Sequence, residues 1–185
     1  MHPQLEAIAR EFTAAEQRLL RLAGSLPGHW WVRRPDPSRW SVAECVAHLN
    51  LSAEAYLPVI QAGLDRARRI GGPPPRRYRR DPVGWLLWRT MGPPVRFRVR
   101  TTAGFLPPAP DSAEGLVEAF SSLQTRQQDA LRAADGLPLG RVRIVSPFDP
   151  RVRYNLYSCL TILPRHQHRH LWQAERVLEE LRSGG

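Results

Sequence analysis

The chain has 185 residues, and apolar residues make up 42% of its composition. This length and apolar fraction are typical of one globular domain, residues 1–185, with a sizeable core. The sequence contains no run of about 18 apolar residues to span a membrane, and its start does not resemble a signal peptide. We therefore expect a cytoplasmic protein that does not associate with a membrane. In that compartment Cys45 and Cys159, which have apolar neighbours, should stay reduced and fill the core.

The chain is strongly basic, with 27 basic residues against 17 acidic ones. Every basic residue is arginine, and the absence of lysine excludes Schiff-base chemistry and phosphate binding by a P-loop. Much of the excess lies between residues 66 and 100, around the glycine and proline run at residues 71–75. Such a patch can bind nucleic acid or an anionic surface. It lacks a recognition helix, an aromatic stacking platform and a zinc-finger spacing, so a solvated loop is favoured and nucleic acid is not expected as a partner.

Two helices are predicted in the first third of the chain. Helical spacing of apolar residues indicates a first helix over about residues 3–25, which the glycine and proline that follow should end. Ser41 and Glu44 have the spacing of a capping box, in which each side chain bonds to the other residue's backbone amide. The box predicts the start of a second helix, whose apolar stripe is expected to end near residues 60–63.

A long irregular insert is predicted over about residues 64–110, which contain many of the prolines and little periodicity. A stretch of this length inside a compact domain is expected to cross between helices and cover one end of a bundle. The apolar residues 85–88 should anchor this crossover on the core, although contact with a membrane or a partner is the alternative. Residues 96–100 alternate between arginine and apolar side chains.

Two more helices follow the insert. Asp111 and Glu114 have capping-box spacing and predict the start of a third helix, which Gly136 should end. Residues 141–145 alternate and can be extended. A fourth helix is predicted over about residues 155–182, with a kink at Pro164 because proline has no amide hydrogen to donate. These elements predict an all-α fold: an up-down four-helix bundle with a long crossover between helices 2 and 3.

Three histidines are candidate metal ligands. His166 and His170 are four residues apart, so they share one face of the fourth helix, whereas His168 points to another side. His48 lies beside the apolar stripe of the second helix and can supply a third nitrogen. Three imidazoles leave an open coordination position, as in reactive rather than structural metal sites. The alternatives are a hydrogen-bonded core histidine at position 48 and a solvated pair on the last helix.

Two segments resemble signatures of a known family. Residues 40–49, WSVAECVAHL, resemble the second-helix signature of DinB-like proteins. Residues 166–173 read His-x-x-x-His-x-x-Gln and resemble the last-helix signature of the same superfamily. Residues 98–107 and the turn at residues 146–148 are also similar to connections in its second DinB-like branch. The likeness extends over nearly the whole chain in order and spacing.

This resemblance implies a four-helix bundle that binds a divalent metal, commonly zinc or nickel, through His48, His166 and His170. Related branches include transferases and isomerases that use a low-molecular-weight thiol, and proteins described as metal-dependent hydrolases. The function expected is therefore that of an enzyme whose metal activates a thiol or water for transfer to, or hydrolysis of, a small molecule. A homodimer is possible in this superfamily. The alternative is a non-catalytic bundle that binds a partner or nucleic acid through its arginine-rich insert.

Three further residues are candidates for support of the centre. Glu44 lies one turn before His48 and can orient that ring, although its duty in the capping box competes with this role. Gln173 lies one turn after His170 and can orient a ligand or a substrate, with simple packing as the alternative. Arg169 can attract an anionic substrate or a cofactor carboxylate, or it can be a solvated side chain.

Overall fold

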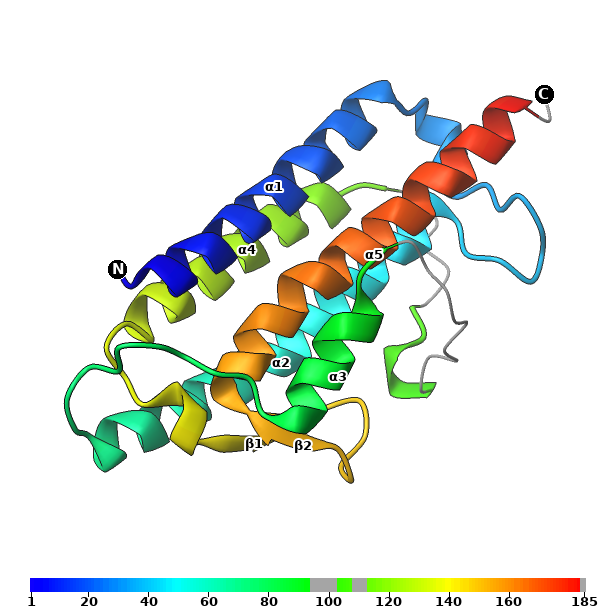
Figure 1. The fold of residues 1–185 in the computed structure, drawn as a ribbon. Coiled ribbons are helices and arrows are strands. Elements are labelled where there is room, and N and C mark those ends of the chain that lie inside the picture. The colour runs from blue at the N-terminus through cyan, green and yellow to red at the C-terminus, as the bar shows by residue number, and fades with distance from the viewer. Residues whose placement is uncertain (94–102, 108–112, 184–185) are drawn as a thin grey trace.

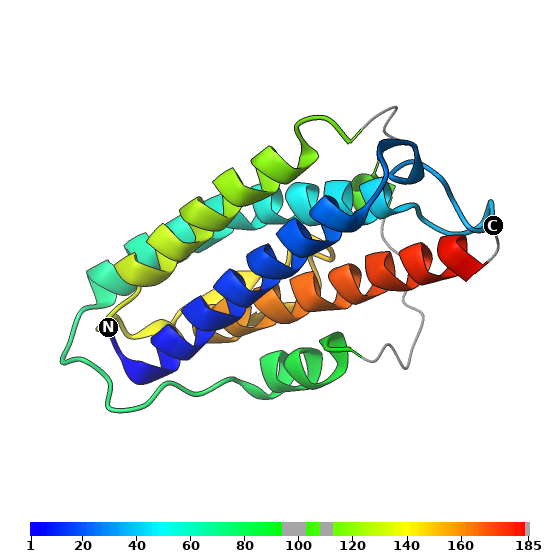
Figure 2. The ribbon, with the colours of Figure 1, turned by 90° about the horizontal axis from the view of Figure 1, so that it is seen from above.

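The computed structural model describes residues 1–93, 103–107 and 113–183. Four long helices pack side by side in it: α1 (Pro3–Ser25), α2 (Val42–Ile70), α4 (Leu116–Ala133) and α5 (Leu156–Ser183). Helices α1 and α2 each contact both α4 and α5, which closes the bundle (Figures 1 and 2). The predicted all-α bundle is therefore confirmed. Among the described residues, no helix is both long enough and apolar enough to cross a membrane.

The direction of the helices explains the long crossover. Helices α2 and α4 run in the same direction along the bundle, whereas α1 and α5 run the opposite way (Figure 1). Because α2 and α4 are parallel neighbours, the chain must return along the length of the bundle before α4 can begin. A short turn can join only antiparallel helices.

Helix α2 begins at the predicted capping box but ends later than expected. Ser41 accepts a hydrogen bond from the Glu44 amide at 3.2 Å, and the Glu44 carboxylate accepts from the Ser41 amide at 2.8 Å. The predicted end near residues 60–63 is wrong, because the helix continues to Ile70. Gly63 allows close packing instead of ending the helix, since an added Cβ would lie 3.1 Å from the Leu156 side chain. Gly71, with a positive φ of 59°, follows the last turn.

The insert is not irregular throughout, which corrects a second expectation. Besides the last turns of α2, it contains helix α3 (Pro82–Met91), which packs along α5. The Asp81 carboxylate caps this helix by accepting from the Gly84 amide at 3.2 Å. Proline at the first helical position suits a helix start, although the sequence there has too few turns to show periodicity. The alternation at residues 96–100 lies outside the described residues.

Only half of the apolar residues 85–88 anchor α3. Leu87 and Trp88 pack against the core, whereas Trp85 and Leu86 are 52% and 56% exposed. A single helix of ten residues presents one stripe to its neighbour, so four consecutive apolar residues cannot all face the bundle. The anchoring role is therefore confirmed for the second pair and wrong for the first.

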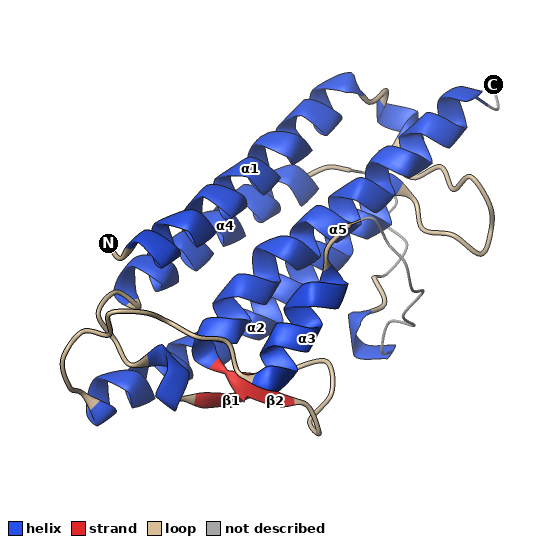
Figure 3. Cartoon of the chain, viewed as in Figure 1, coloured by secondary structure: helices blue, strands red, loops and turns tan. Residues whose placement is uncertain are grey.

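The remaining elements agree in part with the sequence. Helix α4 begins at Leu116 after Gly115, which has a positive φ of 72°, so the predicted start at Asp111 is wrong; Asp111 itself lies outside the described residues. The extended segment is confirmed as β1 (Arg143–Val145), which pairs antiparallel with β2 (Arg153–Asn155) at one end of the bundle (Figure 3). Helix α5 follows β2 directly, with Pro164 inside it. The kink at this proline stays a prediction.

Candidate metal centre

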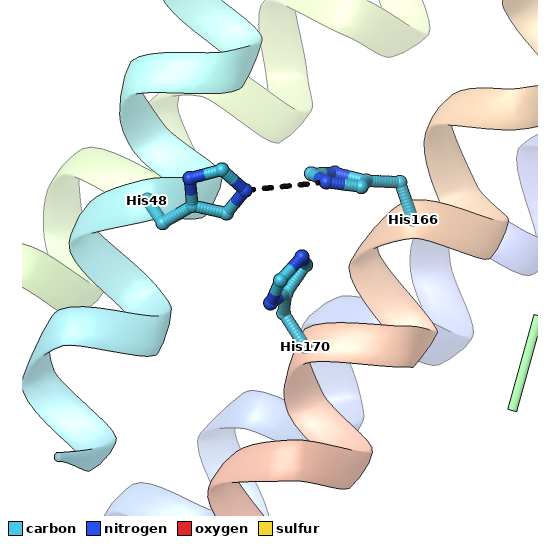
Figure 4. Close-up of side chains that lie close together, drawn as sticks. All are labelled: His48, His166 and His170. Atoms are coloured by element: carbon cyan, nitrogen blue, oxygen red, sulfur yellow. Dashed lines mark hydrogen bonds between the residues drawn. The ribbon is translucent and has the colours of Figure 1, made fainter. Parts of the chain in front are cut away.

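The three predicted histidines meet in the interior of the bundle. His48 extends from α2 toward His166 and His170, which lie one turn apart on the facing side of α5 (Figure 4). All three are buried, with at most 8% of each residue exposed. One ligating nitrogen from each lies within 4.8 Å of the others. The i, i+4 spacing therefore placed two rings on one face, and the packing of α2 against α5 supplied the third.

The nitrogen spacing fits a tetrahedral ion. His48 Nε2 and His166 Nε2 are 3.3 Å apart. Two imidazole nitrogens bound at about 2.0–2.1 Å to a tetrahedral zinc ion lie about 3.3–3.4 Å apart. A ligating nitrogen of His170 lies within 4.8 Å of the other two. The residues present therefore suit a divalent metal with three nitrogen ligands and an open position.

Hydrogen bonds at the outer edge of two rings orient them. His48 Nδ1 lies 2.9 Å from the carbonyl oxygen of Phe105, in the short helix η2 (Ala103–Phe105). A carbonyl only accepts, so Nδ1 must carry the hydrogen and Nε2 keeps its lone pair toward the centre. His170 Nδ1 is 3.2 Å from Oε1 of Gln173, which accepts in the same way. Two of the three rings are thus held in the tautomer that binds a metal through Nε2.

Burial keeps the centre uncharged. It lowers the pKa of His48, and it lowers the pKa of His166 from 6.5 to about 3, with smaller contributions from His48 and the Arg169 charge. His170 has its pKa held well below the ordinary value by burial and then by the two other histidines. Neutral imidazoles are the form that ligates a metal. The site is therefore ready to bind a cation without first losing protons.

Aromatic side chains wall the centre. Trp40 stacks on His170 with ring centroids 5.8 Å apart and also lies 5.0 Å from the His48 ring. Phe148, from the turn between β1 and β2, lies 6.1 Å from the His48 ring and 5.8 Å from that of His166. Its own ring packs on Phe105 at 4.0 Å. These apolar surfaces lower the local dielectric and limit access of water.

The sequence did not single out the aromatic wall as part of the site. In the sequence, residues 146–148 resemble only a family turn, and Trp40 is only part of the second-helix signature. Phe105 acts through its backbone carbonyl, which carries no sequence signal. Only proximity in the fold brings these groups to the histidines.

Glu44 fixes the start of α2. Besides the capping box, its carboxylate accepts two hydrogen bonds from Arg34, one of them at 2.9 Å from Nε. Burial by itself raises the pKa of Glu44, but the bonds from Arg34 and Ser41 outweigh burial, so the pKa is lowered and the side chain stays charged. The capping interpretation is confirmed, and the outer nitrogen of His48 uses the Phe105 carbonyl as its acceptor.

Arg169 is close enough to affect the centre through its charge. Its guanidinium is partly buried, and burial lowers its pKa. The positive charge contributes to the lowered pKa values of His166 and His170. An anion bound at the centre would therefore be attracted by Arg169, and a metal cation would meet some repulsion from it.

The fold and the centre together define a helical-bundle protein with a buried three-histidine site that can hold a metal ion. Residues 11–174 match the family model described as the DinB superfamily, and the chain belongs to that superfamily. The match spans α2 and the part of α5 that carries the histidines. Searches of curated proteins and of solved structures found no match.

Proposed function

We propose that the protein is a metal-dependent enzyme whose divalent ion, zinc or nickel, is held by His48, His166 and His170. The observation that carries the proposal is the convergence of three buried, neutral imidazoles at a spacing that fits such an ion. A merely structural histidine cluster would be expected to satisfy the lone pairs of its inner nitrogens with hydrogen-bond donors. Here His48 Nε2 and His166 Nε2 face each other, an arrangement that a shared proton or a cation stabilises.

The reaction class proposed is activation of a thiol or of water for transfer to, or hydrolysis of, a small molecule. An ion held by three neutral ligands keeps its double positive charge, so when bound it lowers the pKa of a water or holds a thiol as thiolate. A low-molecular-weight thiol is the proposed cofactor for the transfer variant. Family resemblance supports this choice, and the aromatic wall supports a small substrate rather than a polymer.

The protein's own residues have separate roles in this proposal. The Phe105 carbonyl and Gln173 hold the rings of His48 and His170 so that Nε2 faces inward. Trp40 and the aromatic residues of the wall exclude bulk water, which strengthens every electrostatic interaction inside the centre. Arg169 is proposed to attract an anionic group of the substrate or the thiol toward the centre.

Metal content tests the proposal directly. The protein is purified without a histidine tag, and bound metal is measured by inductively coupled plasma mass spectrometry. We expect about one zinc or nickel per chain in the wild type, and loss of it in His170→Ala. His168→Ala is the matched control, because His168 is two residues away on α5 but faces Glu11 and Arg18 instead of the centre. It should keep the metal.

Activity is then assayed on the metal-loaded protein with pairs of thiol and electrophile, and with hydrolysable esters and amides. Turnover that needs the metal and is lost in His170→Ala but kept in His168→Ala supports the enzyme. Protein that takes up neither zinc nor nickel when it is offered either metal would refute the proposed centre.

A further inference from the structure

Two arginines lie against one tryptophan between α3 and α5. The guanidinium carbon of Arg80 lies 4.1 Å from the ring centroid of Trp88, and that of Arg165 lies 4.3 Å from the same centroid. The two charges are therefore no further apart than the sum of these distances. Both side chains are partly buried, so water screens their repulsion only in part. We call these three residues the Arg80–Trp88–Arg165 cluster.

The cluster lacks a negative partner among the described residues. Arg80 donates from Nε to Thr161 Oγ1 at 2.9 Å, which is a neutral acceptor. Arg165 Nε is buried and has no hydrogen-bond partner in the described part of the chain. Neither guanidinium forms an ion pair there; Glu11, which pairs with His168, raises the pKa of Arg165 through its charge but does not outweigh burial. Stacking on an indole offsets part of this cost but does not neutralise two charges.

The cluster is held in a defined shape before any ligand binds. Trp88 stacks on one side of Arg165, and Gly92, just after α3, lies on another. A Cβ added at Gly92 would lie 2.2 Å from Arg165 Nη2, so the guanidinium rests directly on the glycine backbone. Arginine donors fixed in a plane are suited to bind the oxygens of a carboxylate or a phosphate.

We propose that the Arg80–Trp88–Arg165 cluster is a binding site for the oxyanionic group, carboxylate or phosphate, of a small molecule. An oxyanion there would offset the repulsion between the two guanidinium groups and give Arg165 Nε or its neighbours an acceptor. Arg165 directly precedes His166, so a molecule anchored by this group would lie along the same stretch of α5 as the histidine centre. The proposal does not require a metal in that centre, because the arginines are independent of it.

Binding is tested on metal-free protein with inorganic phosphate and with acetate as probes. Isothermal titration calorimetry and thermal unfolding are measured at constant ionic strength, so that general screening is the same in every sample. We expect at least one probe to bind and to raise the melting temperature. Tighter binding of phosphate indicates a phosphoryl group on the natural ligand, and tighter binding of acetate indicates a carboxylate.

Two kinds of variant identify the site. Arg80→Gln and Arg165→Gln should each weaken binding about tenfold or more, because each removes a charge-assisted contact. Arg79→Gln is the matched control: it also removes one positive charge next to Arg80 in sequence, but its side chain is exposed. It should bind the probe as the wild type does. Circular dichroism confirms that each variant is folded.

Gly92→Ala tests the position of the Arg165 guanidinium without removing a charge. It keeps all arginines but pushes the Arg165 guanidinium from its place, so it should also weaken binding. The proposal is overturned if neither probe binds the wild type, or if Arg165→Gln binds as tightly as Arg79→Gln. These measurements use metal-free protein, so failure to bind either probe counts against the anion site alone. Failure of the metal centre appears instead as protein that takes up neither zinc nor nickel.

Discussion

Lowering the pH should destabilise the metal-free protein through the buried histidines. Burial lowers the pKa of His166 and of His170 in the folded chain, whereas both return to about 6.5 on unfolding. A base with a lower pKa in the folded state binds fewer protons there than in the unfolded chain. Stability is therefore present in full above about pH 6.5 and is lost as the pH falls below it, until the folded pKa is reached.

The size of the effect follows from the pKa of His166, which is about 3 in the folded protein. At about pH 5 this ring is still neutral when folded but protonated when unfolded. Each pH unit in this window corresponds to about 1.4 kcal/mol per histidine, so His166 alone should account for about 2 kcal/mol between pH 6.5 and 5. Carboxylates such as Glu44, whose ordinary value is 4.5, contribute only at lower pH.

Urea unfolding followed by circular dichroism, with a chelator present, measures this difference at about pH 7 and about pH 5. The wild type should lose about 2 kcal/mol more of its free energy of unfolding than His166→Gln, which has no ring to titrate. His29→Gln, at an exposed histidine, should behave like the wild type. If His166→Gln keeps the full pH dependence of the wild type, the burial argument is refuted.

Three further predictions concern packing, ring orientation and the thiols. Gly84→Ala should destabilise the fold by about 1–3 kcal/mol in urea unfolding, since its Cβ would lie 2.1 Å from Ser158 Oγ. Gly24→Ala, which has open space around the added Cβ, should not destabilise the fold. Equal stability of the two variants would contradict this reasoning. Gln173→Leu should weaken zinc binding about 10- to 100-fold in a competition titration, because His170 loses the acceptor that orients it; unchanged affinity would argue against that role. Both cysteines are buried and burial raises the pKa of each thiol, so neither should react with a thiol reagent before the protein unfolds, and rapid labelling of folded protein would be the contrary result.

The longest helices could be predicted because their signals are local. The apolar stripe of α1 and the capping box at Ser41 are read from residues within a few turns of one another. The end of α2 could not be read in this way. Gly63 is a helix-ending residue by type, yet it lies inside α2 because Leu156, far away in the sequence, packs against it.

Helix α3 is an element that the sequence does not predict. Ten residues are too few to establish a period, and isolated helices of this length are marginal in water. Its stability comes from packing on α5 and from the Asp81 cap, which also accepts from Ser158 Oγ at 2.8 Å. These contacts appear only when the chain has folded.

For the site, the sequence by itself predicted three histidines as candidate ligands. Helical spacing places His166 and His170 on one face, and the family signatures point to His48 as their partner. The tertiary structure decided what surrounds them: the Phe105 carbonyl and Phe148 come from connecting segments whose sequence does not show that they reach the histidines. The periodicity of a helix determines only the directions in which its own side chains point. Distances between helices depend on how every side chain between them packs. The convergence of three nitrogens, and of two arginines on Trp88, is therefore a property of the folded bundle.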